Sequence, residues 1–103
     1  MYDDLSSWAW LTDHIPYGRA EAVSADYLSK LFGMEKRELR RVIEDARRNN
    51  ILICGDNHGY YKPVSDNEIR AYVHRVRGRI RTASKCLAPF LREINRMDGG
   101  GGL

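Results

Sequence analysis

Gly33 stands between two short segments whose apolar residues recur at helical spacing. Leu28 and Phe32 lie five residues and one residue before it, and Leu39 and Val42 lie six and nine residues after it. Glycine readily adopts the left-handed conformation that ends a helix. Because the apolar residues on both sides must share one core, this spacing predicts two helices that cross steeply around one tight turn.

Residues that favour helix ends bracket both segments. Ser24 is a good N-cap for a first helix over residues 25–32. A second helix should begin near Glu35, because Glu38 can reach back to unpaired backbone donors there, and should end at Asn49-Asn50. Its apolar residues recur at i, i+3, i+4 and i+7, which turns one face toward the core. That face holds Leu39, Val42, Ile43 and Ala46.

A third helix is expected before this pair. Residues 3–14 carry an apolar stripe with a period near 3.6 residues, and Pro16 and Gly18 then end the helix and open a loop. The two tryptophans of this segment cannot both face the core. We expect Trp8 to be buried and Trp10 to be exposed.

A β-hairpin should follow the second helix. Residues 51–54 are apolar and predict one strand, and residues 60–62 predict its partner. Between them, residues 55–59 include two glycines, aspartate and asparagine, which favour a five-residue turn. Pro63 cannot donate a ladder hydrogen bond and should lie at the strand end. Cys54 is expected to face the core.

Two crossed helices followed at once by a hairpin resemble the winged-helix family, in which the second helix of a helix-turn-helix can enter the major groove of DNA. The resemblance implies a fold that is mainly α with a small β-hairpin. A winged helix-turn-helix domain would cover residues 1–64, with an appended long C-terminal helix over residues 65–97. The resemblance also implies a short strand at Glu21–Val23. A closer similarity, to small phage-encoded winged-helix proteins of bacteria, rests on Ile15–Gly18, Gly33, Arg37–Arg40 and Gly59–Tyr61.

Positive charge accumulates in the second predicted helix and in the C-terminal segment. Residues 1–34 carry two basic and five acidic side chains, residues 35–62 carry seven and five, and residues 63–103 carry eight and four. This distribution suits a polyanionic partner. We therefore expect non-enzymatic binding of double-stranded DNA, with arginines of the second helix on guanine or phosphate and the hairpin on the backbone. The expected DNA-binding residues are Lys36, Arg37, Arg40, Arg41, Arg47, Arg48, His58 and Lys62.

Other interpretations of the basic helix stay open. Its arginines could form a solvated face that pairs with Glu44 at helical spacing. Winged helices also serve as interaction or assembly modules, as in a replisome or a virion, because a fold does not determine function. RNA fits less well, since no aromatic stacking platform is evident. Among roles on DNA, regulation of transcription and replication both fit.

The apolar residues of segment 66–97 step alternately by four and three over four heptads, as in a coiled coil. Such a stripe exceeds what one small domain can cover. We expect homodimerisation, with packing on the same chain or on another protein as alternatives. Pro89 should kink or split the helix after about Leu87, and residues 98–103 should form a disordered tail. The expected dimerisation residues are Ile69, Val73, Val76, Ile80, Ala83 and Leu87.

Nothing in the sequence favours catalysis, a cofactor, a metal or a small-molecule substrate. His14, His58 and His74 lie in separate segments and lack ligand spacing. Cys54 and Cys86 form no C-x-x-C pair and indicate reduced thiols. No apolar run approaches the ~20 residues that span a bilayer, and no basic-then-apolar start is present. We therefore expect no membrane contact and a location in the cytoplasm of a bacterium or a phage-infected cell.

Overall fold

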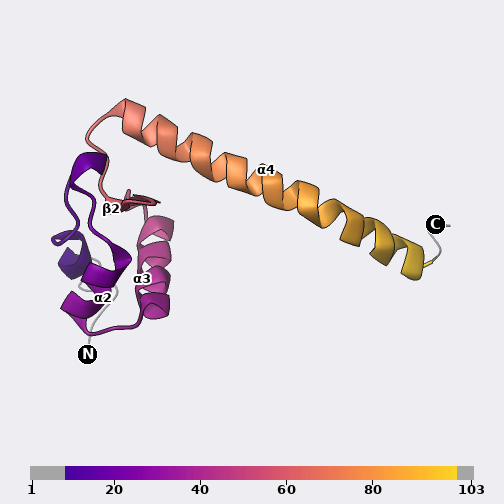
Figure 1. The fold of residues 1–103 in the computed structure, drawn as a ribbon, viewed down its shortest axis with the longest axis horizontal. Coiled ribbons are helices and arrows are strands. Elements are labelled where there is room, and N and C mark those ends of the chain that lie inside the picture. The colour runs from indigo at the N-terminus through magenta and orange to yellow at the C-terminus, as the bar shows by residue number, and fades with distance from the viewer. Residues whose placement is uncertain (1–8, 100–103) are drawn as a thin grey trace. The chain divides into compact units, whose positions relative to one another are not determined.

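The computed structural model describes residues 9–99 (Figure 1). Residues 9–12 are helical, and a turn follows at residues 13 and 14, where the predicted first helix should end. The predictions for Trp8 and for the start of that helix lie outside the described residues. The remaining elements, in chain order, are the 3-10 helix η1 (Arg19–Glu21), α2 (Ala25–Phe32), α3 (Lys36–Arg48), β1 (Cys54–Asp56), β2 (Gly59–Tyr61) and α4 (Asp66–Met97).

The predicted class, mainly helical with a small antiparallel hairpin and a long C-terminal helix, is confirmed. The chain divides into two compact units, Met1–Arg70 and Ala71–Leu103. This division lies six residues beyond the boundary expected after residue 64, inside α4. The two units are therefore best described separately.

Local capping explains why α2 has the predicted bounds. The side chain of Ser24 accepts a hydrogen bond from the backbone N–H of Tyr27 at 3.0 Å, which satisfies one of the unpaired donors of the first turn. At the other end Gly33 has φ 63 and ψ 35, the left-handed conformation expected for it. Beyond it, the N–H of Met34 donates to the carbonyl of Ser29 at 3.0 Å. The turn between the two helices is thus closed by backbone hydrogen bonds.

The bounds of α3 are also as predicted. The backbone N–H of Glu35 donates to the Glu38 carboxylate at 3.1 Å, so the expected capping interaction forms. The helix ends at Asn49, and Asn50 adopts a positive φ of 71. Asparagine tolerates this conformation better than most side chains. The backbone N–H of Ile51 then returns to the carbonyl of Ala46 at 3.1 Å, which directs the chain toward β1.

The predicted hairpin exists, but its predicted register is wrong. Cys54 pairs with Tyr61 and Asp56 pairs with Gly59, so the turn contains two residues instead of five. The Asp56 carboxylate accepts a hydrogen bond from the backbone N–H of His58 at 2.8 Å. This side-chain interaction closes a short turn, and it lets Gly55 and Asp56 extend β1. Residues 51–53, predicted as strand, precede it.

Glu21–Val23 does not form the short strand that the resemblance implied. Arg19–Glu21 is the 3-10 helix η1, and Val23 alone forms an isolated antiparallel bridge with Tyr60 of β2. Two backbone hydrogen bonds make this bridge, at 3.0 Å from Val23 N–H and at 2.7 Å from Tyr60 N–H. The helical turn of η1 leads directly into this contact. Too few residues therefore remain extended to form a strand.

Gly59 is required by the close approach of the Val23 backbone. Its φ is 125, and a Cβ atom at this position would lie 2.1 Å from the carbonyl oxygen of Val23. That distance is far inside van der Waals contact, and the obstructing atom belongs to the backbone. Only a residue without a side chain fits where the hairpin meets the segment before α2.

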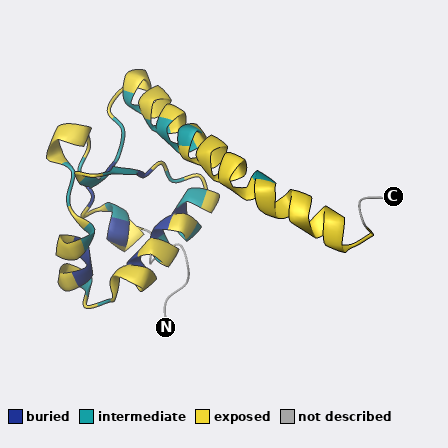
Figure 2. Ribbon diagram, turned by 45° about the vertical axis from the view of Figure 1, so that its right-hand side comes forward, coloured by how far each residue is buried: buried dark blue, intermediate teal, exposed yellow. Residues whose placement is uncertain are grey.

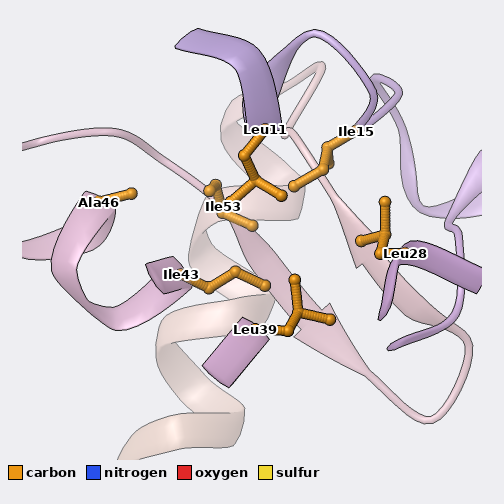
Figure 3. Close-up of a cluster of buried hydrophobic side chains, with 7 residues drawn as sticks. All are labelled: Leu11, Ile15, Leu28, Leu39, Ile43, Ala46 and Ile53. Atoms are coloured by element: carbon orange, nitrogen blue, oxygen red, sulfur yellow. The ribbon is translucent and has the colours of Figure 1, made fainter. Parts of the chain in front are cut away.

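One apolar core holds the first unit together (Figure 3). Cys54 and Tyr61 are also buried, as expected for Cys54. Trp10 is exposed, as predicted, and packs against Phe32 with the ring planes tilted by 44° and ring centroids 3.8 Å apart. The side chains at the centre of the core are Leu11, Ile15, Leu28, Leu39, Ile43, Ala46 and Ile53.

The element α4 is one helix of 32 residues that continues through Pro89. The Ser65 hydroxyl accepts a hydrogen bond from the backbone N–H of Glu68 at 3.3 Å, so serine caps its start. The prediction that Pro89 splits the helix is wrong. Proline removes one backbone donor, but the helical conformation continues on both sides of it. The expected kink near Pro89 stays a prediction. Asp98 and Gly99 form a turn at the helix end, and the rest of the predicted tail lies outside the described residues.

Candidate nucleic-acid interface

The helix α3 has two chemically opposite faces. Leu39, Ile43 and Ala46 are buried in the core, whereas basic side chains cover much of the opposite side. Figure 2 shows this contrast as dark blue positions next to yellow ones along the same helix. Because the core contacts hold one face inward, the basic face is presented to solvent in a defined orientation.

Arg40 and Arg41 are the two cations of this face that have no competing partner in the part of the chain that the structure describes. Both side chains are exposed. Among residues 9–99, neither guanidinium takes part in an ion pair or a side-chain hydrogen bond. An exposed and unpaired guanidinium keeps all five donors available for an external acceptor. These two arginines are therefore the strongest candidates for contact with an anionic ligand.

Three further predicted residues lie on α3 in weak, exposed ion pairs. Lys36 Nζ is 3.6 Å from Asp26, Arg37 is 3.8 Å from Glu35, and Arg48 is 4.0 Å from Asp45. Exposed pairs at such distances contribute ~0–1 kcal/mol each. The cations can leave these carboxylates at little cost, so they stay available to a polyanion.

Acidic residues interrupt the C-terminal half of the basic face. A shallow depression there is lined by Arg41, Val42 and Arg48 together with Glu44 and Asp45. The solvated-helix interpretation paired Glu44 with an arginine. In the part of the chain that the structure describes, Asp45 instead forms the ion pair with Arg48. The first half of α3 therefore carries the more purely cationic surface.

Two predicted DNA-binding residues are engaged within the protein. The Nε–H of Arg47 donates to the carbonyl of Ile53 at 2.8 Å. Lys62 Nζ donates to the carbonyl of Thr12 at 2.8 Å and lies 4.4 Å from the centroid of the Tyr17 ring. Both side chains are partly buried, and each ties the hairpin region to another segment. Their positions indicate a structural role.

His58 lies at the hairpin turn, in a polar cluster that sequence reasoning missed. Its side chain is 64% exposed, and its Nδ1 is 3.5 Å from the Asp56 carboxylate. Arg19, from η1, forms an ion pair with the same carboxylate and lies 3.4 Å from His58. The side chain of Asp56 is only 5% exposed. Because 37 residues separate Arg19 from Asp56, no local sequence signal could have indicated this cluster.

The Asp56 carboxylate is held in its charged form. Burial raises its pKa, but the hydrogen bonds from Arg19 and from the His58 backbone outweigh burial, so the pKa of Asp56 lies below its ordinary value of 3.8. The same hydrogen bond raises the pKa of Arg19. The backbone N–H of Arg19 also donates to Glu68 at 3.1 Å. This cluster therefore fixes the hairpin turn to η1 and to the start of α4.

The predicted dimerisation residues lie along α4, and none of them is buried. Ile69 and Val73 are partly exposed at 37% and 38%, whereas Ile80 is 59% exposed. In Figure 2 no position of α4 is dark blue. Most of the apolar stripe of the helix is thus exposed in the single chain, and Val76 is half-buried.

Two other kinds of site, a metal centre and a membrane-spanning helix, find no support among the described residues. No group of three or more histidine, cysteine, aspartate or glutamate side chains in this part of the chain could hold a metal ion. Among the same residues, no helix has both the length and the apolar character to cross a membrane. Comparisons of the chain with protein-family models, with curated proteins and with solved structures found no match.

Proposed function

We propose that this chain is a non-enzymatic double-stranded DNA-binding protein of the winged-helix type, with α3 as the helix that enters the major groove. The observation that carries this proposal is the exposed pair Arg40 and Arg41, which have no protein partner among the described residues, on a helix whose opposite face is anchored in the core. A helix with exposed arginines fits the width and the chemistry of the groove.

The arrangement around α3 supports the same function. Helices α2 and α3 are joined at the left-handed Gly33, and a hairpin follows α3 directly. In the proposed complex, Lys36 and Arg37 lie near the start of α3 and contact base edges or phosphates. The hairpin turn, with the exposed His58, contacts the backbone. Phage or bacterial regulation and replication are the settings that fit such a protein.

Arg47 and Lys62 have a different role in this proposal. Their hydrogen bonds to the carbonyls of Ile53 and Thr12 connect the hairpin to α3 and to the first helical segment. Removing either side chain takes away one of these hydrogen bonds. These residues therefore hold the binding surface in shape, and the contacts to DNA come from the exposed cations.

Fluorescence anisotropy against a random-sequence duplex tests the proposal. The variant Arg40→Ala/Arg41→Ala should bind at least about tenfold more weakly than the wild type, since a lost base contact costs ~1–3 kcal/mol. The logarithm of the binding constant falls linearly with the logarithm of the salt concentration, and the slope of this line should be shallower by about two in the variant. The matched control is Arg81→Ala/Arg92→Ala, which removes the same net charge from α4 at exposed positions.

Two outcomes would contradict the placement of α3 in the groove. One is unchanged duplex affinity in the α3 variant, with an unaltered circular dichroism spectrum. The other is an equal loss in the α4 control, which would indicate attraction by net charge alone. The same titrations with single-stranded DNA and RNA of equal length should give weaker binding, because a protein that reads the major groove should prefer the duplex.

The second candidate is a protein-interaction or assembly module that does not bind DNA sequence-specifically. The exposed apolar residues of α4 favour it, since they offer a surface for another polypeptide. The two functions differ in their response to salt. Binding through several arginines should weaken steeply between low and physiological salt, whereas apolar contact of a helix with a protein should not.

A further inference from the structure

The apolar stripe of α4 consists of two alternating rows. One row contains Val73, Ile80, Leu87 and Ile94, and the other contains Ile69, Val76, Ala83 and Phe90. Large members of both rows are uncovered: Ile80 is 59% and Phe90 is 68% exposed. We propose that a second copy of this chain covers the stripe, with its α4 running antiparallel. This inference does not depend on the proposed function.

The heptad spacing favours another α4 helix as the occupant. Rows that alternate every three and four residues along the 26 positions from Ile69 to Ile94, about 39 Å of helix, match the surface of a helix with the same period. The two helix-weakening residues lie off the stripe: Gly78 and Pro89 belong to neither row. The contact surface thus stays continuous over the full length.

Side-chain volumes favour the antiparallel direction. In a parallel pair in register, each residue faces its own copy, so Ala83 would meet Ala83 and leave a gap, while Phe90 would meet Phe90 and overfill its layer. In an antiparallel pair each row faces the other row. One register then places Ile80 against Ala83 of the second copy, Val76 against Leu87 and Val73 against Phe90. These layers have more even volumes, which close packing requires.

Charge along the edges of the stripe favours the same direction. Arg70, Arg77 and Arg79 flank its N-terminal half, whereas Ser84, Cys86, Leu91 and Glu93 flank its C-terminal half. A parallel pair would gather the arginines of both copies along one half, where like charges repel. An antiparallel pair places the arginines of each copy beside the uncharged and acidic flank of the other.

Sedimentation equilibrium of the full chain, from micromolar to several hundred micromolar, tests the assembly. The wild type should be a dimer, and Ile80→Asp should be monomeric because it introduces a carboxylate at the central layer. Ile80 is exposed in the single chain, so this change should leave α4 helical by circular dichroism. Thr82→Asp, an exposed position off the stripe, should remain dimeric. A wild type that is monomeric throughout, or an Ile80→Asp variant that dimerises like the wild type, would overturn the proposal.

Disulfide trapping tests the direction. In a Cys86→Ser background, the double variant Val73→Cys/Phe90→Cys should form a covalent dimer on oxidation. The two positions in one helix are 17 residues apart, about 25 Å, which excludes an internal bond. Each single variant should stay uncrosslinked, because position 73 faces position 90 of the second copy. Crosslinking of the single variants would establish a parallel pair, and absence of any crosslink would rule out this register.

Discussion

Replacing Gly59 by alanine tests the packing that joins the hairpin to the helical part of the first unit. A Cβ atom there would lie 2.1 Å from the Val23 carbonyl oxygen, 2.5 Å from the Val23 carbonyl carbon and 3.0 Å from the Ser24 nitrogen. All three atoms belong to the backbone, so no rotation of a side chain relieves the clash. The chain must instead open the bridge between Val23 and Tyr60.

The cost has two parts that the structure identifies. Opening the bridge removes two backbone hydrogen bonds, at 2.7 and 3.0 Å, each of which contributes ~0.5–1.5 kcal/mol. Holding alanine at φ 125 adds strain of ~1–3 kcal/mol. The free energy of unfolding should therefore fall by roughly 2–6 kcal/mol. In a small domain this corresponds to a decrease in Tm of at least about 10 °C.

Gly33→Ala is the matched control. Gly33 also has a positive φ, 63, but among the described residues, its chain neighbours aside, no atom obstructs the Cβ position within 4 Å. Its replacement should cost only the ~1–2 kcal/mol of the left-handed conformation. Urea unfolding followed by tryptophan fluorescence reports on the first unit, because Trp10 packs against Phe32. If Gly59→Ala proved no more destabilising than Gly33→Ala, the backbone approach at Val23 would not be the constraint described here.

Two other predictions concern the residues that hold the candidate interface in shape. Arg47→Ala should lower the free energy of unfolding by ~1–2 kcal/mol, because the Ile53 carbonyl loses its donor. Arg48→Ala, at an exposed position, should change the free energy of unfolding by less than ~0.5 kcal/mol. Urea titration of both variants measures these values, and equal effects would contradict the structural role of Arg47. Asp56→Asn should be less stable than the wild type at pH 7. Since the folded-state pKa of Asp56 lies below 3.8, the stabilisation is present above that pH and is lost as the pH falls through the lower folded value. Thermal unfolding from pH 7 to pH 2 should therefore show the two proteins converging below about pH 3.8, and a constant difference would refute the role of the charge.

Helix bounds could be predicted because their causes are local. The cap at Ser24, the left-handed Gly33 and the interaction of Glu35 with Glu38 each act within a few residues. The buried face of α3 followed from its period alone, since a helix anchored on one side must bury the residues that share that side. These features required no knowledge of the rest of the fold.

The hairpin register and the roles of single cations could not be predicted in this way. Gly55 and Asp56 have the composition of a turn, yet they extend β1 because the Asp56 carboxylate closes the turn at His58. Arg47 and Arg48 are neighbours of the same residue type. Only the position of the Ile53 carbonyl makes Arg47 a structural residue and leaves Arg48 in a weak surface pair.

Taken alone, the order of residues determined where α2 and α3 start and stop, which face of α3 is apolar and where α4 carries its heptad rows, because neighbours in the chain govern all of these. Tertiary structure decided which basic side chains are tied down within the protein, how Arg19 reaches Asp56, and why Gly59 admits no side chain. Each of those outcomes depends on atoms from distant segments that folding brings within a few ångströms of one another.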